Sequence, residues 1–325
     1  MARPSRASSA SSSKSWDRRS RADAAYARSR GYRQPVKPVV TASLDLAARL
    51  PRLILEARRV SASVHGIHGR RRAGPGETFW QYRPLVTGES SSRIDWRRSA
   101  RDGHLFVRER EWEASHAIWL WIDRSASMGF ASSLALASKV DRALIAGFAL
   151  AETLVDGGER VGHLGLTRAL ASRRIVETLA QAILADTKGA DLDLPPAAPL
   201  PRLADAIIIT DGLSPADSLA KRIATLSSSG ARGHVLLIAD PIEETFPFTG
   251  QAELFDLEDG LSLRVGDAGS WGVEYRQRLE AHRDAIREAC RKAGWTLTLH
   301  RTDRPASEGV LRIASLVAAA RGTGR

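Results

Sequence analysis

A short apolar run that ends abruptly in an acidic residue constrains the fold of this chain most strongly. Residues 118–122 read I-W-L-W-I, Asp123 follows directly, and Ser125 and Ser127 occupy the next alternate positions. A continuous apolar run of this length, bounded by turn residues, is typical of a strand buried on both faces of a sheet. Open α/β sheets bind ligands at the carboxyl ends of such strands, so we expect Asp123 to lie at a binding edge.

A second run repeats this pattern. Residues 206–210 read A-I-I-I-T, and Asp211 and Gly212 follow, the glycine permitting a sharp exit from the strand. Together Asp123, Ser125, Ser127 and Asp211 form a candidate metal site. Carboxylate and hydroxyl oxygens suit Mg²⁺, with Mn²⁺ or Ca²⁺ as alternatives, rather than zinc or copper. The simpler interpretation is that each aspartate only caps a helix.

Strands and helices alternate through residues 115–320. Strands are expected at 118–122, 160–166, 206–210, 234–239 and 295–300, and helices at 134–155, 173–185, 215–227, 275–293 and 309–320. Strands separated by helices predict an α/β domain with a Rossmann-like, doubly wound and mostly parallel sheet. Two short apolar runs, at 253–256 and 261–263, predict a hairpin near the edge of the sheet.

The sequence before this domain divides into two parts. Residues 1–37 contain ten Lys/Arg and two Asp, which is most of the net charge of +11. We expect residues 1–40 to be a disordered basic Ser/Arg-rich tail with at most weak nucleic-acid contact. Residues 41–114 predict a helix, broken or started near Pro51, and then a small β-rich segment. In that segment aromatic residues, including Trp96, lie among arginines, and we expect them to pack rather than to stack on nucleic acid.

Composition excludes several classes of protein. No stretch approaches the eighteen apolar residues of a membrane span, and no secretory leader is recognisable. The only cysteine is Cys290, so an intrachain disulfide is impossible. We therefore expect a cytoplasmic protein without membrane insertion.

Two stretches resemble one bacterial family. The first is F-W-Q-Y-R-P-L-V-T-G-E-S-S-S-R-I-D-W-R-R-S-A-R at residues 79–101, and the second is I-D-R-S-A-S-M at residues 122–128. Together they resemble the domain of unknown function 58 proteins, which belong to the von Willebrand factor A-like group. The resemblance implies a von Willebrand factor A-like domain with a loop of the metal-ion-dependent adhesion site type.

The resemblance also implies a role and exposes one departure. Family members are often encoded beside MoxR-type AAA+ ATPases, which suggests an adaptor that works with such an ATPase in protein maturation or stress response. A complete adhesion-type site takes a further threonine from a loop between its two aspartates. Thr187 lies in the expected place, but D-T-K-G-A-D-L does not match the usual loop, and Thr167 is a weaker candidate.

Three functions remain open at this point. The leading hypothesis is a non-enzymatic interaction domain whose metal would accept a carboxylate from a partner. The alternative is a metal-dependent hydrolase, but the sequence contains no P-loop, nucleophile elbow or H-E-x-x-H motif. Nucleic-acid binding by the basic tail is the least favoured.

Overall fold

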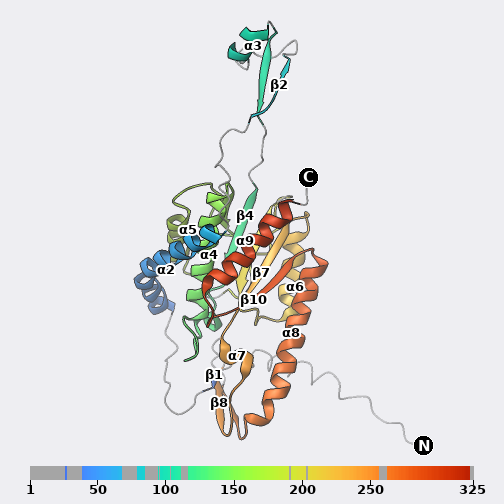
Figure 1. The fold of residues 1–325 in the computed structure, drawn as a ribbon. Helices are drawn as coiled ribbons and strands as arrows, with labels where there is room; N and C mark the ends of the chain where they lie inside the picture. Colours follow the sequence, from blue (N-terminus) through green and yellow to red (C-terminus); the bar gives the residue numbers. More distant parts are fainter. Residues whose placement is uncertain are drawn as a thin grey trace, which may run out of the picture.

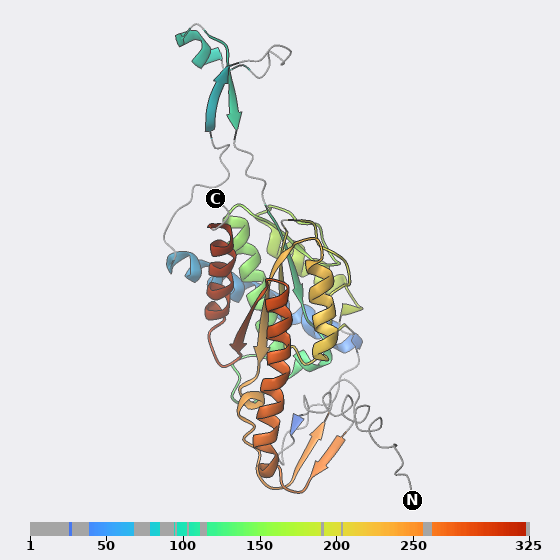
Figure 2. The ribbon, with the colours of Figure 1, turned by 90° about the vertical axis from the view of Figure 1, so that its right-hand side faces the viewer.

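A five-stranded parallel sheet forms the centre of the fold (Figures 1 and 2). The computed structural model describes residues 26–27, 39–67, 79–84, 94, 96–102, 104–110, 116–189, 192–202, 204–255 and 262–322. Within them the sheet has the order β10-β7-β6-β4-β5, with all neighbours parallel. Its strands are β4 (Ala117–Ile122), β5 (Arg160–His163), β6 (Asp205–Thr210), β7 (Arg232–Ala239) and β10 (Thr296–Arg301). The prediction of a Rossmann-like, mostly parallel α/β sheet is confirmed.

The order in which the chain adds strands to the sheet reverses at β4. From β4 the chain passes to β5 on one side, and then crosses to β6 on the other side before continuing outward to β7 and β10. The carboxyl ends of β4 and β6 therefore border the switch point, the edge at which open α/β sheets bind their ligands. The two aspartates singled out by the sequence both follow these strands.

Helices cover both faces because the strands are apolar on both sides. Ile118, Leu120 and Ile122 of β4 pack into one core, whereas Trp121 packs into the other. The first core is closed by α4 (Lys139–Asp156), α5 (Ile175–Ala185) and α9 (Ala306–Gly322). The second is closed by α6 (Ala216–Ser227) and α8 (Gly272–Lys292), as Figures 1 and 2 show.

One long helix adds a third layer over the first core. Helix α2 (Val39–Ile67) is continuous through Pro51, so the predicted break or start at that residue is wrong. A proline inside a helix removes a hydrogen bond and costs roughly 3 kcal/mol. Burial of Leu50, Leu53, Ala57 and Val64 against the core offsets this cost.

Two small sheets lie outside the main one. The predicted hairpin is present as β8 (Ala252–Phe255) and β9 (Ser262–Val265), but β8 also pairs with β1 (Tyr26–Ala27) in a separate sheet. These two residues fall inside the predicted disordered tail; the rest of residues 1–38 lies outside the described residues.

The segment between α2 and β4 contains a second antiparallel pair, β2 (Phe79–Pro84) with β3 (Phe106–Arg110), and the short helix α3 (Trp96–Asp102). A small β-rich segment was expected here, but the expectation that Trp96 packs is wrong: it is 62% exposed. The remaining elements are α7 (Pro241–Thr245) and the 3-10 turns η2 (Ala126–Gly129) and η4 (Gly269–Trp271). Within the described ranges, no helix combines the length and apolar character needed to cross a membrane.

Candidate functional site

The four residues predicted to form a site do come together. Asp123 follows β4 and Asp211 follows β6, and because these strands are parallel neighbours their carboxyl ends lie side by side. The backbone N–H of Asp123 donates to the Ile209 carbonyl at 2.9 Å, which fixes the exit of β4 against β6. The residues between the strand end and α4 then turn through η2, which carries Ser127.

Hydrogen bonds join these residues into one cluster. Asp123 Oδ1 accepts from the backbone N–H of Ser125 at 2.9 Å and from its Oγ at 2.6 Å. The hydroxyls of Ser125 and Ser127 are 3.2 Å apart, and Ser127 Oγ donates to Asp211 Oδ2 at 2.7 Å. We call Asp123, Ser125, Ser127 and Asp211 the oxygen cluster. All four are buried, so the cluster lies beneath the loop surface.

A threonine that the sequence analysis did not assign completes the environment of Asp123. Thr210 Oγ1 donates to Asp123 Oδ2 at 2.7 Å and accepts from the backbone N–H of Gly212 at 3.0 Å. Of the two threonines considered, Thr167 accepts from the backbone of His163, and Thr187 is exposed. The signal for Thr210 was its place at the end of β6, directly before Asp211.

Burial changes the acidity of the cluster. Removal from water, together with the nearby Asp211 carboxylate, raises the pKa of Asp123 to about 7. The hydrogen bonds from Ser125 and Thr210 oppose this rise, because they stabilise the ionised form. Burial beside Asp211 therefore favours the protonated form of Asp123 more than in an exposed aspartate.

A buried lysine is the largest feature that the sequence analysis missed. Lys139 is the first residue of α4 and only 1% exposed, yet its Nζ donates to Asp211 Oδ2 at 2.9 Å and to Glu243 Oε1 at 2.6 Å. The Phe130 ring lies 5.8 Å from the ammonium. Burial lowers the pKa of Lys139, but the charges of Asp211 and Glu243 outweigh it and raise that pKa, so the lysine stays charged.

Glu243 is held in position for this contact. Asp240 caps α7 by accepting from the Ile242 N–H at 2.9 Å, and Glu243 Oε2 accepts from the Asp240 N–H at 2.8 Å in a capping box. One carboxylate oxygen of Glu243 thus faces the backbone while the other faces Lys139. The second oxygen of Asp240 accepts from the Ser132 N–H at 2.8 Å, which ties α7 to the connection between β4 and α4.

The fit of a divalent ion can be tested against these contacts. The oxygen cluster offers the donors that a hard cation prefers, but every carboxylate oxygen in it already accepts a hydrogen bond. A magnesium ion bound at about 2.1 Å to Asp211 Oδ2 would lie within about 5 Å of the Lys139 ammonium. At an effective dielectric constant of about 20, their repulsion is about 7 kcal/mol. In the part of the chain that the structure describes, no group of three His, Cys, Asp or Glu is arranged to hold a metal. The Lys139 ammonium therefore opposes a divalent ion beside Asp211.

The loop is also anchored on the side of α5. The guanidinium of Arg124 pairs with Asp186 and donates to the Ile183 carbonyl at 3.0 Å, at the end of α5. A side chain at residue 189 would collide with this guanidinium, which explains the glycine there. Arg124 thus anchors the β4 loop to the segment after α5 in which Thr187 lies.

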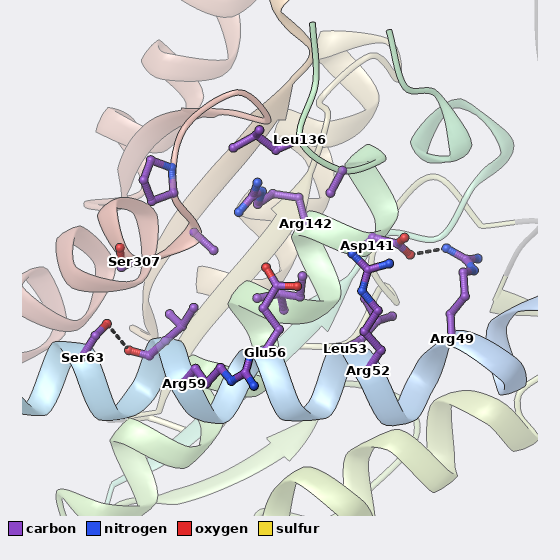
Figure 3. A pocket seen from close by; sticks show the side chains of 15 residues that line it. Arg49, Arg52, Leu53, Glu56, Arg59, Ser63, Leu136, Asp141, Arg142 and Ser307 are labelled. Carbon is purple, nitrogen blue, oxygen red and sulfur yellow. Dashed lines mark hydrogen bonds and ion pairs between the residues drawn. The ribbon is translucent and has the colours of Figure 1, made fainter. Parts of the chain in front are cut away.

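A cavity of about 360 Å³ lies on the other side of the first turn of α4, between α2 and the start of α9 (Figure 3). Arg49, Arg52, Arg59 and Arg142 line it together with Glu56 and Asp141. Guanidinium groups outnumber carboxylates in this lining, and Arg49 is paired with Asp141. The buried Arg142 donates to the Thr302 carbonyl at 3.1 Å.

Comparisons with known proteins identify a family and several relatives of this chain. The family model described as "Protein of unknown function DUF58" matches residues 81–285, which include the whole oxygen cluster. An uncharacterized protein of Mycobacterium bovis and two of Mycobacterium tuberculosis are each 29% identical to this chain over 290 residues, covering 83% of this chain and 89% of the relative. No solved structure gives a significant match.

Proposed function

We propose that this chain, which belongs to the DUF58 family of proteins of unknown function, is a non-enzymatic interaction domain. Its binding surface would be the connection between β4 and α4, residues 124–138, above the oxygen cluster. The resemblance of D-x-S-x-S and T-D-G to the adhesion-type loop of von Willebrand factor A-like domains supports a binding role at this edge. The topological switch point is also where open α/β sheets bind.

One observation carries the proposal: the acidic and hydroxyl groups are buried and bonded to one another, while Ala126 and Gly129 of the same connection are exposed. Asp123 is 1% exposed and Asp211 is 8% exposed, whereas Ala126 and Gly129 face solvent. Groups so placed hold a loop in a fixed shape, which reduces the entropy lost when a partner binds. A hydrolase would instead need one of these carboxylates to reach a substrate or a water molecule.

The same connection presents apolar side chains. Leu134 is 55% exposed and Leu136 is 68% exposed, both between η2 and α4. Large apolar side chains beside a rigid loop suit a protein partner, because their burial contributes to association. The partner we propose is a MoxR-type AAA+ ATPase, on the ground of the family resemblance, with a role in protein maturation or stress response.

The test measures binding of the purified chain to a purified MoxR-type ATPase by biolayer interferometry. Ala126→Trp places a bulky side chain on the exposed loop, and Leu134→Asp charges the apolar part; each should weaken binding by on the order of tenfold or more. The matched control is Ser229→Trp, because residue 229 is exposed in the turn before β7, at the opposite end of the sheet. Equal binding by all three variants and the wild-type chain would remove the proposed surface.

A further inference from the structure

The inference concerns the charge balance at the oxygen cluster. A lysine at the first position of a helix is electrostatically unfavourable, because the helix dipole places partial positive charge there. Lys139 occupies this position in α4 and is 1% exposed, so it also loses the hydration of its ammonium. A buried charge of this kind needs close partners of opposite sign, and Asp211 and Glu243 provide them.

The arrangement around the ammonium is specific. Its contacts are 2.9 Å to Asp211 Oδ2 and 2.6 Å to Glu243 Oε1, and Glu243 is oriented by the capping box of α7. Asp211 Oδ2 also accepts from Ser127, so the ammonium and the loop hydroxyl share one oxygen. Lys139 therefore links the loop above β4, the end of β6 and the start of α7 through one cation.

We propose that the Lys139 ammonium is the resident cation of this site. It takes the place beside Asp211 that a divalent metal would need, and it holds the loop of residues 124–129 in shape without a metal ion. A divalent cation then binds at the oxygen cluster only when Lys139 is removed. This inference rests on the proposed function for the meaning of the loop, but its test measures metal binding and not partner binding.

The experiment titrates Mn²⁺ into the purified full-length chain by calorimetry, and in parallel measures the melting temperature in about 5 mM Mg²⁺ and in chelator. The wild-type chain should show no saturable binding at the cluster and the same melting temperature in both buffers. Lys139→Met removes the charge and keeps an unbranched side chain, leaving Asp123, Asp211 and Glu243 without a cation. This variant should gain saturable Mn²⁺ binding that the wild-type chain lacks, and Mg²⁺ should raise its melting temperature.

Two controls keep the result interpretable. Lys221→Met changes an exposed lysine of α6 and should behave as the wild-type chain does. If Lys139→Met does not fold in chelator, its folding on addition of Mn²⁺ supports the proposal. The wild-type titration does not depend on this variant, because Mn²⁺ binding at the cluster of the wild-type chain would by itself reject the proposal. Tight Mn²⁺ binding by the wild-type chain that Asp123→Asn abolishes would overturn the proposal, as would a folded Lys139→Met variant without any gain in affinity.

The two proposals fail separately. Mn²⁺ binding to the wild-type chain together with partner binding that Ala126→Trp weakens would reject the role of Lys139 and keep the interaction surface. If the wild-type chain binds no Mn²⁺ and its binding to the ATPase is unaffected by Ala126→Trp and Leu134→Asp, the interaction surface is rejected and the role of Lys139 is kept.

Discussion

Gly212 offers the sharpest test of how the chain positions Asp211. Its φ is +70°, a left-handed conformation that costs an L-residue about 1 kcal/mol or more. A Cβ at this position would also lie 2.7 Å from Leu237 Cδ2 and 3.4 Å from Ile286 Cδ1 in the second core. Overpacking of a well-filled core costs typically about 1–3 kcal/mol. Gly212→Ala should therefore lower the free energy of unfolding by about 2–4 kcal/mol.

Two other glycines separate these contributions. Gly230 has φ +88° but an added Cβ would meet nothing within 4 Å, so Gly230→Ala should cost only the backbone part, about 1 kcal/mol. Gly129 lies in η2 without a positive φ and is equally open, so Gly129→Ala should be neutral or stabilising by up to about 1 kcal/mol. Urea denaturation of the three variants gives all three values. A Gly212→Ala variant no less stable than Gly230→Ala would refute the packing argument, and equal values for all three would refute the backbone argument.

Three further predictions address the rest of the fold. Trp96→Ala should change the free energy of unfolding by no more than about 0.5 kcal/mol, because the side chain is 62% exposed. A loss of several kcal/mol in urea denaturation would show that Trp96 packs against the rest of the protein. Leu53→Ala should cost about 2–5 kcal/mol, since Leu53 is 3% exposed between α2 and the core, and a thermal melt like that of the wild-type chain would show that α2 is not docked. Burial lowers the pKa of His163 to about 4, so the folded chain binds fewer protons than the unfolded chain between pH 4 and 6.5. The contribution of His163 to the free energy of unfolding is therefore complete above pH 6.5 and is lost as the pH falls to 4, at most about 3 kcal/mol. The free energy of unfolding of His163→Gln should fall less steeply over this pH range. Parallel curves of stability against pH for the variant and the wild-type chain would contradict the assignment.

The sequence was most informative where apolar runs end in polar residues. The runs before Asp123 and Asp211 predicted two parallel strands, and the structure places them as neighbours at the switch point. Ligands bind open α/β sheets at the carboxyl ends of the strands, and each of these runs marks such an end. The two runs together were therefore enough to predict the cluster. Whether the four residues hold a metal was a separate prediction, and it rests on charges that come from elsewhere in the chain.

Lys139 and Glu243 show why the rest was not predictable. They are 104 residues apart, and nothing in K-V-D-R or P-I-E-E indicates that they meet. A lysine at the start of an apolar helix reads as a solvated residue, and only the packing of α7 beside the β4–α4 connection gives it a buried partner. The helix start was also placed too early: the prediction began the helix at Leu134, whereas α4 begins at Lys139 after the Ser138 cap.

The measurement that tests the account most directly is hydrogen exchange of the chain alone and bound to a MoxR-type ATPase. The account predicts slower exchange on binding in the connection between β4 and α4, residues 124–138, with little change in residues 228–231 at the opposite end of the sheet. Protection confined to residues 228–231 or to β2 and β3, with none in residues 124–138, would contradict the claim that the loop above the oxygen cluster is the binding surface.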